Sequence, residues 1–285
     1  MSIAHNSENE PKLSYFICTT PRSGSTMLCY GIESTGLGGI ASGTPHELFL
    51  PLFRKEISAC LQTYDIDSYI KSIKKRFMTS NGIFGTKIMW RDFSKLLKEI
   101  SENFKAKKIS DLELLKQTFG DVRFIYLKRL NKLEQAISIS RAIQSGIWHL
   151  KAESKKEKVS MESKKARDEF SFLKILHYKS SLEVNDQCWE NFFKNNDIKP
   201  LLLVYEELID DFASKIYQVL NYLDKDIKRV DISVNPQVEK LADSRSKDWA
   251  DKFLKINKRF FWLEPFFLFL ARLNIIFRMY RFKSP

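Results

Sequence analysis

The sequence predicts an α/β protein with a parallel β-sheet covered by helices on both faces. Four short apolar segments have the length and bulk of buried strands, and each is followed by a segment with helical periodicity. Tens of residues separate consecutive strands, which is enough for a crossover helix between parallel neighbours. The predicted strands are residues 13–20, 82–89, 122–129 and 200–208. Ligands bind such sheets at the carboxyl ends of the strands, so the residues after each strand are the candidates for function.

The composition indicates one globular domain with a basic surface. With 285 residues, of which 44% are hydrophobic, the chain is large and apolar enough to form a full core. The net charge of +12 favours a polyanionic partner, such as a phosphate-rich cofactor or an anionic membrane surface. No nucleic-acid partner is expected, because the basic residues are dispersed and no motif combines them with aromatic residues for base recognition.

Cysteine usage and the N-terminus favour a cytoplasmic protein. The four cysteines are scattered without a Cys-x-x-Cys pair, so neither a zinc site nor a disulfide framework is expected. No acidic cluster has metal-ligand spacing, so no metal is expected at all. Residues 1–12 are predicted to be a disordered N-terminus and lack the apolar core of a signal peptide.

The segment Thr20–Thr26, TPRSGST, follows the first predicted strand and leads into a helical pattern. The first backbone N–H groups of a helix lack intrahelical partners and the helix dipole is positive there, so an anion is favoured. A capped helix without a ligand is the simpler alternative. The loop also lacks the Gly-Lys-Ser/Thr of nucleoside triphosphatases, so another anion than the end of ATP is expected. The candidate anion-binding residues are Arg22, Ser23, Gly24, Ser25 and Thr26.

This loop resembles the 5′-phosphosulfate loop of sulfotransferases, which bind 3′-phosphoadenosine 5′-phosphosulfate (PAPS); Arg22 stands where better-known members carry a lysine. Four later blocks resemble, in the same order, the bacterial trehalose 2-sulfotransferase family: GGIASGTPHELF, FGTKIMW, VRFIYLKRLNKLEQAISISRAIQSGIW and LLLVYEEL. The resemblance covers about residues 13–250. It implies a P-loop-like sulfotransferase fold for a domain at residues 13–257. It also implies an enzyme that transfers the sulfuryl group of PAPS to a hydroxyl of a carbohydrate or glycolipid.

The resemblance implies a site for the 3′-phosphate of PAPS after the third strand. In sulfotransferases an arginine at the end of a strand and a serine on the next helix hold this group, and here Arg129 and Ser138 are the candidates. Arg129 lies nine positions before Ser138, whereas the family spacing of eight falls on Leu130. Either Arg129 still reaches the phosphate, or Lys128 and Arg141 take part. Ser138 and Arg141 are three residues apart and therefore share a helical face.

Sulfuryl transfer to a sugar hydroxyl requires a group that removes the proton and cations that stabilise charge. The resemblance assigns the general base to Glu47, in GTPHELF, which also makes it an acceptor-binding candidate. Its neighbour His46 is the rival, because its ordinary pKa is closer to neutrality. Arg22 in the loop and Lys87 near the end of the second strand are the candidates for charge stabilisation, and Trp90 is a candidate for stacking on the sugar ring.

Two features of the C-terminal part remain open. The segment LADSRSKDW resembles a family block that covers the nucleotide, so Arg245 and Lys247 are further candidates, with a solvated helix face as the alternative. Residues 258–285 are predicted to be an amphipathic helical segment, interrupted by charges too often to span a membrane. This segment either packs on the body or on the second subunit of a homodimer, or it makes peripheral contact with a membrane through residues 258–282.

Two other functions compete with sulfuryl transfer. A nucleotide-dependent kinase of related fold would need a Gly-Lys-Ser/Thr and a strand-end aspartate for magnesium, whereas the predicted strand ends offer Lys87 and Arg129. A non-catalytic module that binds membrane surfaces or proteins would use the basic charge and the C-terminal segment without nucleotide.

Overall fold

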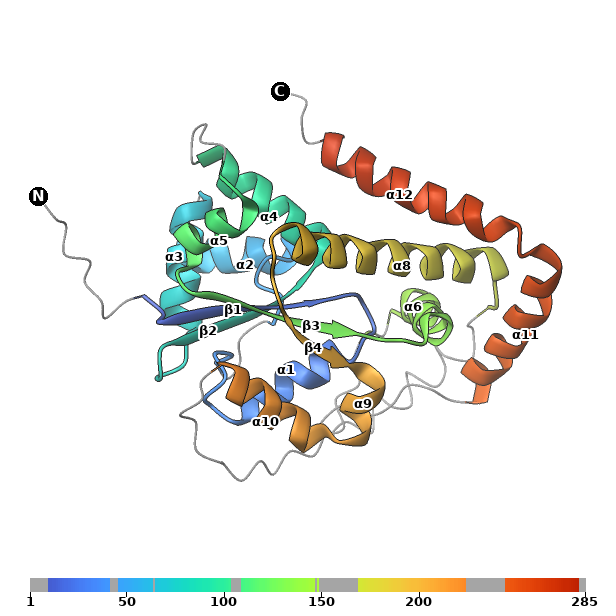
Figure 1. Cartoon of the computed structure of the whole chain (residues 1–285), viewed down its shortest axis with the longest axis horizontal. Helices are drawn as coiled ribbons and strands as arrows, with labels where there is room; N and C mark the ends of the chain where they lie inside the picture. Colours follow the sequence, from blue (N-terminus) through green and yellow to red (C-terminus); the bar gives the residue numbers. More distant parts are fainter. Residues whose placement is uncertain are drawn as a thin grey trace, which may run out of the picture.

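A computed structural model describes residues 10–41, 46–63, 65–103, 109–146, 148, 169–223 and 244–281, with side chains up to residue 275. It confirms the predicted α/β class: four parallel strands form one sheet in the order β2-β1-β3-β4 (Figure 1). The strands are β1 (Leu13–Thr19), β2 (Ile83–Met89), β3 (Val122–Lys128) and β4 (Leu201–Val204). Of the predicted disordered N-terminus, residues 1–9 lie outside the described residues.

The last predicted strand is shorter than expected. The apolar run at 200–208 was predicted as one strand, but β4 ends at Val204 and the helix α9 (Tyr205–Asp210) begins directly after it. The acidic side chains Glu206 and Glu207 stand in the first turn of α9, where the helix dipole favours negative charge. This early end matters for function, because it places Tyr205 at the carboxyl edge of the sheet.

Helices cover both faces of the sheet, as the apolar strands require. Alternate residues of β1 point to opposite faces, so Phe16 and Cys18 join one buried cluster while Tyr15 and Ile17 join another. The first cluster packs against α2 (Pro51–Leu61), α3 (Ile66–Phe77), α4 (Trp90–Asn103), α5 (Asp111–Phe119) and α8 (Phe172–Asn195). The second packs against α1 (Ser25–Ser34), α9 and α10 (Phe212–Leu223), which lie on the other side of the sheet in Figure 1.

Three more helices complete the part of the fold that the structure describes. They are α6 (Lys132–Ser145), α11 (Ser244–Phe260) and α12 (Leu263–Arg281). A third buried cluster joins α6, α8 and α11 through Ile137, Ile175, Trp249 and Phe253. Figure 1 shows α12 running back along α8, and an ion pair between Lys179 and Glu264 links the two helices. Residue 258, where the predicted C-terminal segment begins, lies within α11.

None of the described helices is long and apolar enough to cross a membrane.

Candidate active site

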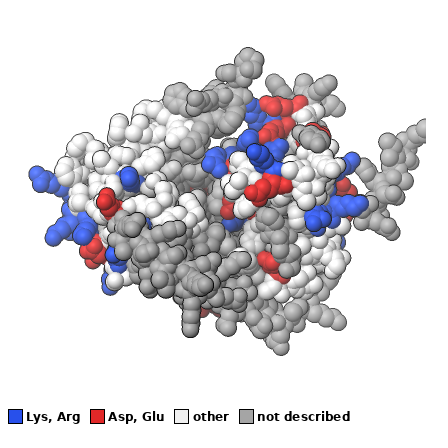
Figure 2. All heavy atoms as spheres, turned by 180° about the vertical axis from the view of Figure 1, so that it is seen from behind, with Lys and Arg blue, Asp and Glu red and all other residues white. Residues whose placement is uncertain are grey.

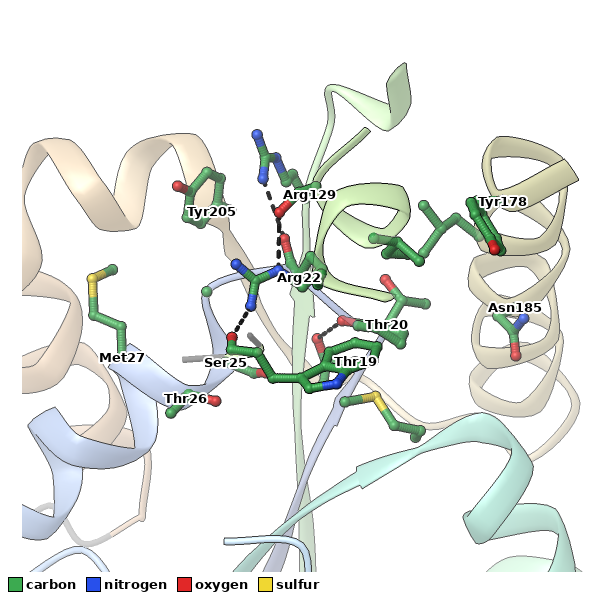
Figure 3. A pocket seen from close by; sticks show the side chains of 18 of the residues that line it. Thr19, Thr20, Arg22, Ser25, Thr26, Met27, Arg129, Tyr178, Asn185 and Tyr205 are labelled. Carbon is green, nitrogen blue, oxygen red and sulfur yellow. Dashed lines mark hydrogen bonds between the residues drawn. The ribbon is translucent and has the colours of Figure 1, made fainter. Parts of the chain in front are cut away.

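A cleft of ≈ 1430 Å³ opens at the carboxyl ends of the strands, where the sequence predicts the site. Its walls come from the loop after β1, the ends of β2 and β3, and the helices α6, α8, α9 and α11 (Figure 3). Most predicted site residues line this cleft: Arg22, Gly24, Ser25, Thr26, Glu47, Lys87, Trp90, Arg129, Ser138 and Arg141. Of the two further candidates on α11, Lys247 lines the cleft.

The loop after β1 makes a tight turn into α1. Arg22 and Gly24 both have positive φ angles, 64° and 83°, which reverse the chain within a few residues. A Cβ at Gly24 would lie 2.5 Å from Cδ2 of Tyr205, so only glycine fits between the turn and this ring. Gly24 also occupies the N-cap of α1 and provides no side-chain cap. The first-turn N–H groups of α1 therefore face the cleft without a capping acceptor, which suits an anion.

Ser23 differs from its neighbours in the loop. Its side chain is fully buried, and its Oγ lies 2.6 Å from Oγ1 of Thr19. Thr19 in turn donates to the carbonyl oxygen of Leu127 on β3 over 2.9 Å. The Ser23 hydroxyl therefore ties the loop to the sheet and points into the interior. The Ser23 hydroxyl, which was predicted to bind the anion, is therefore not among the groups that line the cleft.

Two guanidinium groups and a hydroxyl meet on one side of the loop. Nε of Arg22 donates to Oγ of Ser138 over 2.9 Å, and its Nη1 donates to the carbonyl oxygen of Trp148. Arg129 donates to the Arg22 carbonyl oxygen over 3.3 Å, and its guanidinium carbon lies 4.5 Å from the ring centre of Tyr205. Burial, and next the positive charge of Arg129, lower the pKa of Arg22. The half-buried Arg22 and the buried Arg129 repel each other, and an anion that binds both would relieve this repulsion.

Further contacts fix these cations in place. Nη2 of Arg129 lies 2.9 Å from a carboxylate oxygen of Glu134, while its buried Nε has no hydrogen-bond partner among the described residues. Arg141 donates to Oγ of Ser246 on α11 over 2.7 Å and packs near the Trp249 ring. The sequence predicted α6 to supply phosphate ligands here, and the structure adds that α11 closes the same wall of the cleft.

Another part of the cleft lining carries a carboxylate and an ammonium group. Lys87 is only 3% exposed, and its Nζ lies 2.7 Å from Oε1 of Glu47 and 3.2 Å from Oγ1 of Thr26. Thr26 belongs to the first turn of α1, so Lys87 connects the anion loop to Glu47. Glu47 is 19% exposed and faces the cleft. An acid and a cation therefore stand side by side at the start of α1.

His46 does not face the same space as Glu47. Its Nε2 lies 3.1 Å from Oε2 of Glu33, and its ring meets the Tyr30 ring edge-on at 4.8 Å between centres. It is absent from the residues that line the cleft. Burial lowers the pKa of His46, and the hydrogen bond to Glu33 offsets part of that shift. Of the two rivals for the base, Glu47 is the one that the structure places in the cleft.

Trp90 lines the cleft, but other aromatic rings hold it. It packs edge-on against Trp189 at 5.1 Å between ring centres, and tilted against Phe93 at 6.0 Å. Its buried indole N–H has no hydrogen-bond partner among the described residues. A face of Trp90 is therefore less accessible for stacking than expected, whereas its N–H is a donor without an acceptor.

Comparison with known proteins identifies the family of this chain. The model of the family described as Stf0 sulphotransferase matches residues 14–255, which include all of the sheet except Leu13 and the whole lining of the cleft. The chain belongs to the Stf0 sulphotransferase family.

Two similar proteins carry the name trehalose 2-sulfotransferase. The protein from Mycolicibacterium smegmatis is 23% identical over 269 residues, which cover 86% of this chain and 96% of the relative. The protein from Mycobacterium tuberculosis is 23% identical over 261 residues, which cover 84% of this chain and 93% of the relative. Among solved structures, the sulfotransferase domain of the Synechococcus PCC 7002 olefin synthase aligns over 100% of this chain and 99% of its own, with 14% identity and a TM-score of 0.37.

Sequence reasoning missed two residues that shape the site of this Stf0 sulphotransferase. Gln135 is fully buried and donates to Oγ1 of Thr20 over 2.9 Å and to the carbonyl oxygen of Pro21 over 2.7 Å, so it anchors the loop to α6. Nothing in the sequence pattern indicates this contact. Tyr205 packs between Gly24 and Arg129, and the strand-end rule would have found it if the last strand had been predicted to end at Val204.

No group of three or more His, Cys, Asp and Glu side chains could hold a metal ion within the described parts of the chain.

Proposed function

We propose that this protein transfers the sulfuryl group of PAPS to a hydroxyl of a sugar or glycolipid acceptor. Membership of the Stf0 sulphotransferase family and the names of the two relatives support this reaction. The observation that carries the proposal is the position of the Glu47–Lys87 pair beside the first turn of α1. A carboxylate and a cation therefore lie beside the helix start at which an anion is favoured.

PAPS would occupy the cleft, with its 5′-phosphosulfate and its 3′-phosphate bound by different sets of residues. The 5′-phosphosulfate would bind the backbone N–H groups at the start of α1, with hydroxyls from Ser25 and Thr26. The 3′-phosphate would bind between Arg129 and Ser138, with Arg22 and Arg141 nearby. The Arg22–Ser138 hydrogen bond supports this assignment, because it brings the loop guanidinium to the 3′-phosphate wall of the cleft.

The chemistry follows from this arrangement. The acceptor oxygen attacks the sulfur, its proton passes to Glu47, and the bond between sulfur and the phosphate oxygen breaks. Negative charge then develops on the leaving phosphate, where Lys87 and the first-turn N–H groups of α1 stabilise it. Every step uses side chains of this chain and the two substrates. The kinase alternative fits less well, since Lys87 and Arg129 stand at strand ends where a magnesium ligand would be needed.

A direct assay tests the proposal. The protein is incubated with PAPS labelled in the sulfuryl group and with trehalose, other sugars and glycolipids in parallel, and sulfated product is measured. We expect product with at least one acceptor, and a thermal shift with PAPS that exceeds the shift with ATP. A chain that binds ATP more tightly than PAPS, or yields no product with any acceptor, would contradict the proposal.

A further inference from the structure

The turn between α11 and α12 exposes an unusual concentration of apolar side chains. Phe261 and Trp262, at the turn itself, are 68% and 61% exposed. Four more large apolar residues beside them are also open to solvent. We call the surface formed by Leu254, Phe261, Trp262, Phe266, Phe269 and Leu270 the aromatic corner. Large exposed apolar patches that are rimmed by polar residues mark protein or membrane interaction sites or ligand-binding grooves.

The inner face of α12 holds the aromatic corner in position. Leu263 and Phe267 pack against the buried cluster that joins α6, α8 and α11, and Ala271 is buried. The ion pair between Lys179 and Glu264 joins α8 to the first turn of α12. Phe266, Phe269 and Leu270 therefore project from a helix whose other face is already packed.

Basic residues surround the aromatic corner. Lys255, Lys258, Arg259 and Arg272 are all exposed. Glu264 is the sole acidic residue in the sequence between 254 and 275, and Lys179 pairs with it. Figure 2, which turns the molecule around, shows Lys and Arg side chains, with Asp and Glu side chains among them, at its left edge, the end of the molecule at which α11 lies. The rim of the aromatic corner is thus positively charged.

We infer that the aromatic corner docks on an anionic membrane surface. Tryptophan and phenylalanine enter the boundary between head groups and acyl chains, while lysine and arginine beside them contact the phosphates. A second copy of the chain fits less well, because a two-fold interface would bring the same basic rim face to face with itself. The contact is interfacial, since none of the described helices could span the bilayer.

Docking would also place the active-site cleft near the membrane. Ser246 and Ala250, at the start of α11, line the cleft, and the same helix ends at the aromatic corner. At about 1.5 Å per helical residue, the fifteen or so residues from Ser246 to Phe261 span roughly 20 Å. The inference concerns binding to the surface and does not depend on which acceptor the cleft takes.

Vesicle sedimentation tests the inference with the full chain. The protein is mixed with vesicles of phosphatidylcholine alone or of phosphatidylcholine with phosphatidylglycerol, and the bound fraction is measured at low and high salt. We expect binding to the anionic vesicles, and weaker binding as salt screens the charges. A wild-type chain that stays in solution with the anionic vesicles overturns the inference.

Two double variants locate the contact. Phe261→Ser with Trp262→Ser should lower the partition coefficient about tenfold or more, because two inserted rings are lost. Lys255→Glu with Lys258→Glu should remove the preference for anionic vesicles. The control is Lys71→Glu with Lys75→Glu, which makes the same change of charge at exposed positions on α3, at the other end of the molecule in Figure 1. Thermal melting shows whether each variant is folded.

The control and the oligomeric state distinguish the alternatives. If the α3 variant loses as much binding as the α11 variant, total charge rather than the aromatic corner drives binding, and the inference fails. Sedimentation velocity gives the second check. A wild-type dimer that the Phe261→Ser and Trp262→Ser variant dissociates, without any vesicle binding, would assign the aromatic corner to contact between copies and overturn the inference.

Discussion

The Nζ atom of Lys87 lies 2.7 Å from Oε1 of Glu47, at the carboxyl end of β2 and beside the first turn of α1. Lys87 is almost completely buried, so Glu47 is its charge partner and fixes its position. In the proposed reaction one residue acts on the acceptor hydroxyl and the other on the leaving phosphate. Glu47 takes the proton of the acceptor, and Lys87 stabilises charge on the leaving group.

Replacing Glu47 tests its assignment as the base. Glu47→Gln keeps the size of the side chain but cannot accept the acceptor proton, so kcat should fall about 100-fold or more. The dissociation constant for PAPS, measured by calorimetry, should change little, because the nucleotide is proposed to bind through other residues. His46→Gln is the matched comparison and should change kcat by only a few-fold. A larger loss from His46→Gln than from Glu47→Gln would reverse the assignment.

Ser138 should discriminate PAPS from adenosine 5′-phosphosulfate, which lacks the 3′-phosphate. Ser138→Ala removes a hydroxyl that would bond a charged group, so the dissociation constant for PAPS should rise about tenfold. The affinity for adenosine 5′-phosphosulfate should stay nearly unchanged, because that nucleotide has nothing at this position. Equal weakening for both nucleotides would instead mean that Ser138 acts on the loop through its bond with Arg22.

Gly24 should be intolerant of alanine for two separable reasons. Its φ of 83° strains any other residue, and the new Cβ would meet the Tyr205 ring at 2.5 Å. Gly24→Ala should therefore lower the free energy of unfolding in urea by about 2 kcal/mol or more, and weaken PAPS binding. Gly36→Ala is the control for backbone strain alone, since Gly36 has a φ of 66° and nothing within 4 Å of its Cβ position. Adding Tyr205→Ala to Gly24→Ala should reduce the loss toward that of Gly36→Ala.

The sequence alone predicted the strands and the start of α1, because these features depend on neighbouring residues. The apolar strands and the loop before α1 could be located because burial and helix starts leave a signature in the residues themselves. The strand-end rule also brought Lys87 and Arg129 to one edge of the sheet. The orientation of Glu47 and His46 could not be decided in this way, because it depends on Glu33 and Thr86, which bind His46 at its side chain and its carbonyl oxygen.

Contacts between residues far apart in the sequence could not be predicted either. In the sequence, Gln135 is an ordinary polar residue of a predicted helix. Only the packing of α6 against the loop shows that it donates hydrogen bonds to Thr20 and Pro21. The sequence also could not decide whether residues 258–285 pack on protein or contact a membrane, because that depends on contacts with distant segments. The pattern shows an amphipathic segment, but only the structure shows which side of α12 the α8 contacts occupy.

His46 should make the stability of the fold depend on pH below neutrality. Burial lowers its pKa from the ordinary value of 6.5, and the bond to Glu33 offsets only part of this. At pH values between 6.5 and the lowered pKa of folded His46, the unfolded chain binds more protons than the folded chain. The free energy of unfolding therefore falls as the pH falls through this range. Urea unfolding of the wild type and of His46→Gln should be compared at about pH 7.5 and 5.5, which bracket the ordinary histidine pKa. Glutamine stays neutral and can still donate to Glu33, so the variant should lose less stability across this interval than the wild type. An equal loss in both proteins would show that His46 does not titrate differently in the folded state.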